Sequence, residues 1–150
     1  MINLEKKYEI LISGEIYEKS LKDILSGSEK TLIYFYPKDN TPGCTLENKD
    51  FSCLRKEFLE KGIQLIGVSK DSIESHKKFV EKQAIENSLI SDPELILHKE
   101  FGAFGEKNNY GKIIQGVIRS TFLLDSNGNI LKEYKNVKAT GHAERILKEM

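Results

Sequence analysis

The two cysteines of this chain, Cys44 and Cys53, are its residues best suited to covalent chemistry. Cys44 lies in the polar segment "PKDNTPGCTLEN", between an apolar run that ends at Pro37 and a stretch with helical spacing. A cysteine in the first turn of a helix meets unpaired backbone N–H groups and the positive end of the helix dipole, which favour an anion. The thiolate is the nucleophilic form of cysteine. The position therefore predicts a reactive thiol, although a small buried side chain without a chemical role also fits it.

The elements that would position Cys44 follow from the hydrophobic pattern around it. The segment "TLIYFYP" (31–37) is a continuous aliphatic and aromatic run ended by proline, which is typical of a central buried strand. Beyond the polar turn, apolar residues recur at three- and four-residue spacing until a glycine, Gly62. That pattern predicts a helix from about Pro42 to Lys61, with proline at its first position.

The rest of the chain repeats this alternation of strand and helix. "IQLIGVS" (63–69) is typical of a second buried strand, and helical spacing follows at 72–83. The β-α-β-α order indicates parallel strands joined by right-handed crossovers. The other predicted elements are an N-terminal hairpin at 10–17, a short helix at 21–25, a strand at 88–90, a helical turn at 93–101, a glycine-containing loop at 102–116, a hairpin with its turn at 126–129 and a final helix at 141–150. We therefore predict an α/β protein with one domain over residues 1–150.

Composition and charge exclude several classes of function. Lysine plus arginine and aspartate plus glutamate each total 23, so the zero net charge gives no long-range attraction to nucleic acid or anionic lipid. The chain shows neither a membrane-spanning apolar stretch nor the features of a signal peptide, and we expect a cytoplasmic protein. A metal site would need a ligand cluster that His76, His98 and His142 do not obviously supply, so we expect them to be structural or solvated.

A wider pattern surrounds Cys44. Pro37, Thr41 and Cys44 follow the spacing P-x-x-x-T-x-x-C, and the segment "YFYPKDNTPGCT" resembles the active-site segment of the peroxiredoxins. The resemblance is closest to the subfamily of the bacterioferritin comigratory protein (BCP), or PrxQ. It extends to "YGKIIQGVIRSTFLLDSNGNI" and to the tail "NVKATGHAERILKEM". The first 30 residues differ, because the family's Pro-Asp-Phe segment is absent there.

The resemblance implies a thioredoxin-like fold, with a central mixed sheet flanked by helices, to which the sequence pattern adds an N-terminal hairpin. It implies a peroxidase that reduces hydrogen peroxide and organic hydroperoxides through a peroxidatic Cys44, without a metal or organic cofactor. Cys44 would be oxidised to a sulfenic acid and reduced by thioredoxin or another external thiol. A monomer or weak homodimer is the expected state.

The reaction itself indicates which groups should surround the thiol. The sulfur attacks one peroxide oxygen in line with the O–O bond, so negative charge develops on the departing oxygen and hydrogen-bond donors must be in place there. The Thr41 hydroxyl, the backbone N–H groups of Gly43 and Cys44, and a guanidinium are candidates. Pro37, which lacks an N–H, would shield the thiol from bulk water.

The candidate guanidinium is that of Arg119, inside the apolar run "GVIRSTFLL". Charged residues seldom occupy such strands unless they are paired, although a solvent-facing position at a strand edge also fits. Arg119 matches the active-site arginine of the family, which favours the catalytic interpretation. Glu47 could hold Arg119 or Arg55, but we prefer to interpret it as an ordinary N-terminal glutamate favoured by the helix dipole.

The role of Cys53 is open. Members of the subfamily often carry a resolving cysteine at the position of Lys49, or in the following helix, where 72–83 contains no cysteine. If one helix covers 44–53, its rise of about 1.5 Å per residue separates the two thiols by roughly 13 Å along the axis. A disulfide needs Cα atoms within about 7 Å, so the first turns would have to unwind. Cys53 is therefore an intramolecular resolver, a bystander or an intermolecular contact.

Two other classes of protein compete with a peroxidase. One is a non-catalytic thioredoxin-like module for redox sensing or binding, and the absence of C-x-x-C argues against disulfide exchange by the usual route. The other is a cysteine phosphatase, whose loop would need an arginine where this chain has Asp50.

Overall fold

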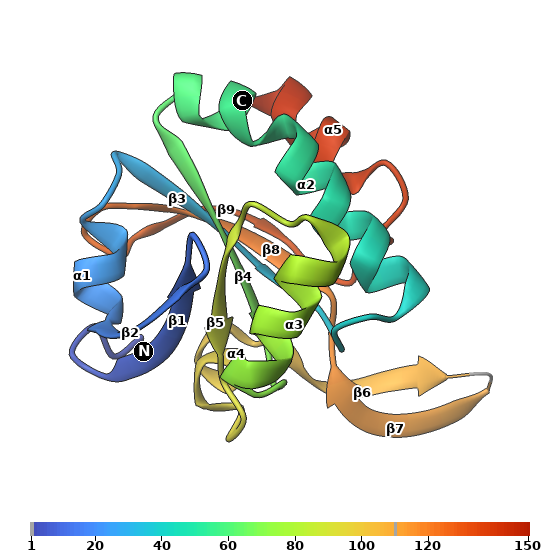
Figure 1. Cartoon of the computed structure of the whole chain (residues 1–150). Helices are drawn as coiled ribbons and strands as arrows, with labels where there is room; N and C mark the ends of the chain where they lie inside the picture. The colour runs from blue at the N-terminus through green and yellow to red at the C-terminus, as the bar shows by residue number, and fades with distance from the viewer. Residues whose placement is uncertain (1, 110) are drawn as a thin grey trace.

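The computed structural model describes residues 2–109 and 111–150, so that Met1 and Tyr110 lie outside the described residues (Figure 1). Within those residues the chain forms nine strands and five helices. The strands are β1 (Lys7–Ile12), β2 (Glu15–Ser20), β3 (Lys30–Phe35), β4 (Ile63–Ser69), β5 (Ser88–Ser91), β6 (Phe104–Asn109), β7 (Lys112–Val117), β8 (Ser120–Asp125) and β9 (Ile130–Tyr134). The helices are α1 (Leu21–Leu25), α2 (Pro42–Glu60), α3 (Ile73–Gln83), α4 (Ile96–Phe101) and α5 (His142–Glu149).

Seven strands form one sheet in the order β2-β1-β5-β4-β3-β8-β9. The central strands β3, β4 and β5 run parallel, because α2 and α3 each return the chain to the end of the sheet where the preceding strand began. The outer strands β1, β2, β8 and β9 pair antiparallel with their neighbours. The predicted α/β class, the central mixed sheet and the N-terminal hairpin are therefore confirmed. That hairpin turns at Ser13 and Gly14, which both have positive φ, as its tight turn requires.

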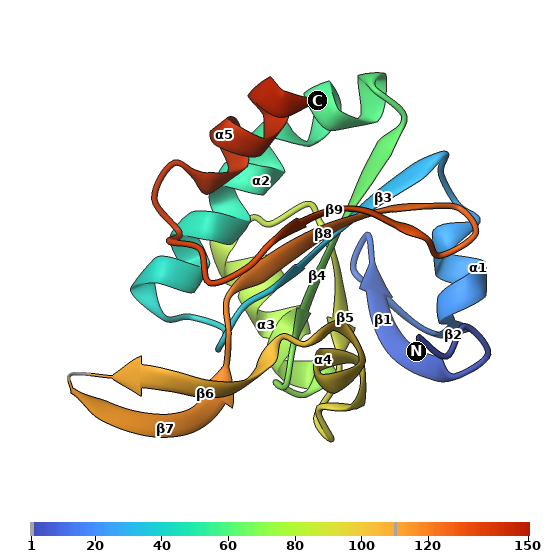
Figure 2. The same cartoon turned by 180° about the vertical axis from the view of Figure 1, so that it is seen from behind.

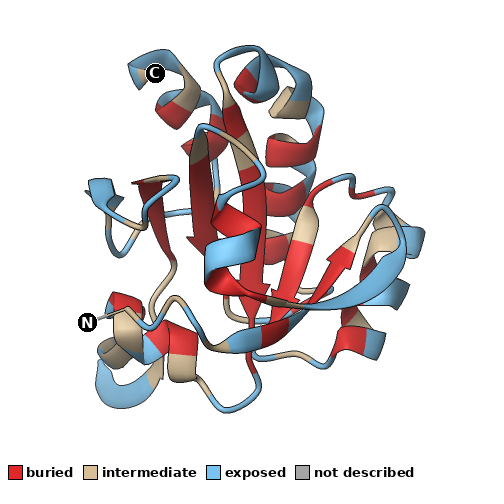
Figure 3. Ribbon diagram, turned by 90° about the vertical axis from the view of Figure 1, so that its left-hand side faces the viewer, coloured by how far each residue is buried: buried red, intermediate tan, exposed pale blue. Residues whose placement is uncertain are grey.

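The sheet is covered on both faces by helices (Figures 1 and 2). Successive side chains of a strand point to opposite faces. In β3, Leu32 and Tyr34 therefore belong to the apolar cluster beneath α2, α3 and α5, whereas Ile33 and Phe35 belong to the cluster that includes α1 and α4. Burial is concentrated in the central strands and in the helix faces that cover them (Figure 3).

The segment after α4 differs from the sequence-based expectation. We predicted a loop at 102–116, and the chain instead forms β6 and β7, a separate two-stranded sheet that extends away from the main one (Figure 1). Ile113 and Ile114 of β7 are both exposed. Strands are recognised from alternation of buried and exposed residues, and a hairpin without a buried face lacks that signal.

The strand pairing brings two distant segments together at one end of the sheet. β3 and β8 are antiparallel, with Phe35 opposite Ser120, so Arg119 lies beside the chain that leaves β3 toward α2. Within the described residues, no helix combines the length and the apolar character needed to cross a membrane.

Candidate active site

Cys44 lies in the first turn of α2, as the sequence predicted. The helix begins at Pro42 after Thr41, whose extended backbone (φ −83°, ψ 152°) ends the polar turn. The Cys44 side chain is buried, with 1% of its surface exposed, and packs in the cluster that contains Tyr34 and Tyr36. The first N–H groups of a helix have no partner within the helix, and those of Gly43 and Cys44 occupy this position.

Arg119 reaches Cys44 from the connection between β7 and β8. Its Nη2 donates a hydrogen bond to Cys44 Sγ at 3.3 Å, and its Nη1 donates to Glu47 Oε1 at 2.5 Å. Only 16% of its side chain is exposed, so it is not the solvent-facing residue that a strand edge would give. A Cβ at Gly43 would lie 3.3 Å from Nη2, so glycine allows the guanidinium to approach the helix start closely.

Glu47 is fully buried. Our interpretation of it as an ordinary glutamate near the start of a helix, favoured only by the helix dipole, is therefore wrong. Burial raises the pKa of Glu47 to about 7, although the Arg119 guanidinium counteracts this by favouring the carboxylate. Its second oxygen, Oε2, has no hydrogen-bond partner among the described residues. A signal was present in the sequence, since Cys44, Glu47, Asn48 and Phe51 follow the i, i+3, i+4, i+7 spacing of one helix face.

Thr41 and Pro37 lie in the loop between β3 and α2. The Thr41 hydroxyl donates to the carbonyl of Lys38 at 2.9 Å. Because that hydrogen is already used, the lone pairs of Thr41 remain to accept a hydrogen bond from a ligand. Pro37 is half-buried, and the loop that it opens carries Asp39, which our sequence reasoning did not single out.

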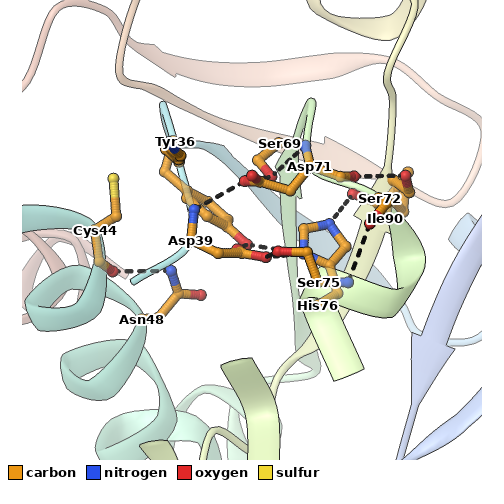
Figure 4. A network of polar contacts seen from close by, with 12 residues as sticks. Tyr36, Asp39, Cys44, Asn48, Ser69, Asp71, Ser72, Ser75, His76 and Ile90 are labelled. Atoms are coloured by element: carbon orange, nitrogen blue, oxygen red, sulfur yellow. Dashed lines mark hydrogen bonds and ion pairs between the residues drawn. The ribbon is translucent and has the colours of Figure 1, made fainter. Parts of the chain in front are cut away.

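Asp39 anchors this loop to the neighbouring elements (Figure 4). Its Oδ1 accepts a hydrogen bond from Tyr36 Oη at 2.7 Å, and its Oδ2 accepts one from Ser75 Oγ at 2.8 Å. Its backbone N–H donates to Asp71 Oδ2 at 2.8 Å. The chain that leads to Cys44 is therefore tied to the residue that follows β3, to the loop after β4 and to α3.

His76 completes the network from α3. Its Nδ1 lies 2.8 Å from Asp39 Oδ2, and its Nε2 lies 2.9 Å from the carbonyl of Ile90. Both ring nitrogens thus lie within hydrogen-bond distance of an oxygen, and the buried ring joins α3 to the loop that carries Asp39 and to β5. His76 is thus structural, as we expected, but it is joined directly to the active-site loop.

The structure does not bring Cys53 to Cys44. Both cysteines are free and lie nine residues apart in the uninterrupted helix α2, Cys44 buried and Cys53 exposed. At about 1.5 Å per residue, the predicted axial separation of roughly 13 Å stands. A bond between them would require the first turns of α2 to unwind.

The histidines occupy separate places and form no ligand cluster. His98 contacts Asp92 at 2.6 Å, and His142 contacts the Thr121 hydroxyl at 2.8 Å. Across residues 2–109 and 111–150, no group of three or more histidine, cysteine or acidic side chains is arranged to hold a metal ion.

Known proteins share both the sequence and the fold. Residues 4–133 match the AhpC/TSA family. The putative peroxiredoxin bcp of Helicobacter pylori is 45% identical over 133 residues, which are 89% of this chain and 86% of the relative. Peroxiredoxin Bcp of Xanthomonas campestris is 47% identical over 116 residues, 77% of this chain and 72% of the relative. A solved structure of the Xanthomonas campestris bacterioferritin comigratory protein has a TM-score of 0.86 and 39% identity, covering 97% of this chain and 90% of that one.

The fold and the site together define a thioredoxin-like protein with a thiol at a helix start. The chain belongs to the AhpC/TSA family, and its relatives identify it as a peroxiredoxin of the Bcp/PrxQ type. It is a thiol-dependent peroxidase, with a peroxide as substrate and a thiol as reductant. The predicted family, fold and activity are confirmed, and a non-catalytic module is not favoured.

Proposed function

We propose that Cys44 is the peroxidatic nucleophile of this peroxidase. The observation that carries the proposal is the contact of 3.3 Å between Arg119 Nη2 and Cys44 Sγ, with Glu47 on the other arm of the guanidinium. A guanidinium is always charged and stabilises the thiolate against the thiol. Glu47 fixes the plane of the guanidinium, so the cation stays directed at the sulfur.

In the first step the Cys44 thiolate attacks one oxygen of the peroxide and the O–O bond breaks. Sulfur gains that oxygen as a sulfenic acid, and the other oxygen leaves as an alkoxide or hydroxide that takes up a proton. The N–H groups of Gly43 and Cys44 and the Arg119 guanidinium are the donors that meet the developing charge. Thr41 accepts a hydrogen bond from the peroxide O–H and aligns it, and Pro37 limits access of water.

The substrates we propose are hydrogen peroxide and organic hydroperoxides. The bacterioferritin comigratory protein of Xanthomonas campestris, whose structure resembles this one, is described as having alkyl peroxide reduction activity. We propose thioredoxin or another external thiol as the reductant of the sulfenic acid. We also propose that the protein is cytoplasmic, that residues 1–150 form one domain, that it is a monomer or weak homodimer, and that it does not act on nucleic acid.

Cys53 enters this scheme only through a change of structure. A Cys44–Cys53 disulfide would form if α2 unwound from its start to beyond its second turn, since one continuous helix holds the sulfurs too far apart. Direct reduction of Cys44 by an external thiol needs less of the helix to open, and we therefore propose it as the main route.

Two measurements test the proposal. The reduced protein should consume peroxide, and Cys44→Ser should abolish that consumption whereas Cys53→Ser should retain the oxidation step. Intact mass after one equivalent of peroxide distinguishes the routes, because a gain of one oxygen indicates a sulfenic acid, a loss of two hydrogens indicates a Cys44–Cys53 disulfide, and a doubled mass indicates a cross-linked dimer. Peroxide consumption that is unchanged in Cys44→Ser would contradict the assignment.

A further inference from the structure

A chain of buried side-chain hydrogen bonds lies beneath the first turns of α2. Asn48 Nδ2 donates to the carbonyl oxygen of Cys44 at 2.9 Å (Figure 4). Asn48 Oδ1 accepts a hydrogen bond from Tyr34 Oη of β3 at 2.5 Å. Tyr34 and Asn48 are both fully buried. The helix start that carries the thiol is therefore bound to the centre of the sheet through a side-chain amide.

Asn87, in the connection between α3 and β5, extends the chain to a third element. Its Nδ2 donates to Tyr34 Oη at 2.9 Å and to the backbone carbonyl of Asn48 at 3.2 Å. Burial raises the pKa of Tyr34 well above its usual range, so its hydroxyl stays neutral and keeps its donor hydrogen. Tyr34, Asn48 and Asn87, which we call the α2 latch, thus join β3, α2 and the chain before β5.

The latch opposes unwinding of the helix segment that carries Cys44. If residues 44–48 leave their places, the Tyr34 hydroxyl and the Asn87 amide lose partners inside an apolar cluster, and an unpaired buried polar group is costly. The Phe51 ring stacks on Tyr34 with a centroid distance of 4.5 Å, and both side chains are fully buried. The first turns of α2 are therefore held more firmly than backbone hydrogen bonds alone would hold them.

Reduction of the oxidised enzyme needs the movement that the latch opposes. A thiolate must attack the sulfur of the Cys44 sulfenic acid, forming an S–S bond while the S–O bond breaks and the oxygen leaves as water after taking up a proton. Cys44 is buried, with 1% of its surface exposed, so a thiol reductant, which is larger than a peroxide, needs the start of α2 to move before its sulfur can reach Cys44 Sγ. The smaller peroxide needs the opposite condition, because its reaction depends on the assembled helix start and Arg119.

We propose that the α2 latch sets the rate at which an external thiol reduces oxidised Cys44, while it preserves the geometry for peroxide attack. Tyr34, Asn48 and Asn87 are positioning residues in this scheme, since they act on the thiol through the helix that carries it. The inference rests on the proposed role of Cys44 as the peroxidatic residue.

The test compares the two half-reactions in Asn48→Ala and Tyr34→Phe with those of the unmodified protein. Reduction of peroxide-treated protein by dithiothreitol, followed as loss of the added oxygen by intact mass, should be about 10-fold faster in each variant, as expected for the loss of a buried hydrogen bond from the closed state. The rate of reaction with hydrogen peroxide, measured by competition with catalase, should be unchanged or lower. The double variant should be little faster than either single variant, because both remove the same connection.

Gln64→Ala is the matched control. Its side-chain amide donates to Ile24 and Thr31 near the start of β4, at the end of the sheet opposite the thiol. It should lower global stability without accelerating reduction. Acceleration in Gln64→Ala equal to that in Asn48→Ala, or a reduction rate unchanged in both latch variants, would overturn the proposal. Tyr34→Phe removes a single oxygen and keeps the test available if Asn48→Ala does not fold.

A separate readout distinguishes failure of the latch from failure of the proposed function. Alkylation of reduced Cys44 by iodoacetamide in a Cys53→Ser background requires the same opening but no peroxide chemistry, and should also be about 10-fold faster in the latch variants. If peroxide leaves Cys44 unoxidised in the unmodified protein, with neither an added oxygen nor a disulfide, the proposed function fails, and the alkylation rates still support or refute the latch.

Discussion

Replacing Arg119 by glutamine should reduce the free energy of unfolding by an amount that increases with pH. Arg119 is the cation that pairs with the fully buried Glu47. Burial raises the pKa of Glu47 from its ordinary 4.5 to about 7 even with the guanidinium present, and its loss would raise that pKa further. The experiment is best done in a Cys44→Ser background, so that ionisation of the thiol adds nothing.

The size of the effect follows from proton linkage. A carboxyl whose pKa is higher in the folded state than in the unfolded state makes the protein less stable as pH rises. In the chain with Arg119 this loss stops near pH 7, where Glu47 becomes ionised in the fold, whereas in Arg119→Gln it continues to higher pH. The stability difference between the two proteins should therefore grow by about 1.4 kcal/mol between about pH 6 and about pH 8, in addition to a constant loss of contacts.

Urea denaturation at the two pH values measures this difference directly. The control is the same pair of proteins with Glu47→Gln, in which the growth with pH should disappear. A stability difference between the protein with Arg119 and the Arg119→Gln variant that is identical at both pH values would refute the claim that Arg119 stabilises an ionised Glu47.

Three further predictions concern the surroundings of the site. Burial lowers the pKa of His142 to about 4, so the folded protein binds fewer protons than the unfolded chain and loses stability as pH falls from about 6.5 to about 4. In thermal denaturation, His142→Leu should remove this part of the stability loss. An equal loss of stability in both proteins would contradict the prediction. A Cβ at Gly67 would lie 2.8 Å from the Tyr34 ring, so Gly67→Ala should destabilise the fold by about 1–3 kcal/mol in urea, and a neutral effect would disprove this close packing. His76→Leu removes one of the hydrogen-bond partners of the buried Asp39 carboxylate, so it should cost about 1–3 kcal/mol and slow the reaction with peroxide. Peroxide kinetics that stay unchanged would show that the contact between Asp39 and His76 does not position the loop before Cys44.

The elements around the thiol were predictable because their signals are local. A continuous apolar run ended by Pro37 and a proline at the first helical position predicted β3 and the start of α2, and the observed helix ends within a residue of the prediction. The hairpin turn at Gly14 was likewise predictable from residues next to each other in the chain. The β6–β7 hairpin was missed because β7 is exposed from Lys112 to Gln115 and so lacks the alternation of buried and exposed side chains.

The polar side chains of the site were harder to interpret. Glu47 and Asn48 are types that usually occupy helix surfaces, yet both face the interior because the face of α2 that begins with Cys44 is the one turned to the sheet. His76, which contacts Asp39, lies 37 positions further along the chain, in an amphipathic helix where a histidine gives no special signal. Such pairs are visible only once the fold has placed their elements together.

The sequence by itself determined that Cys44 would stand at the start of a helix behind a buried strand, since strand, turn and helix are specified by neighbouring residues. It also excluded close approach of Cys53 while the helix is intact, since helical rise alone sets that spacing. Tertiary structure decided what touches the thiol. Arg119 is 75 positions from Cys44, and it reaches the sulfur because β8 pairs with β3 and directs the preceding residue toward the first turn of α2. Contacts at such separation depend on the pairing of the whole sheet, which no local pattern encodes.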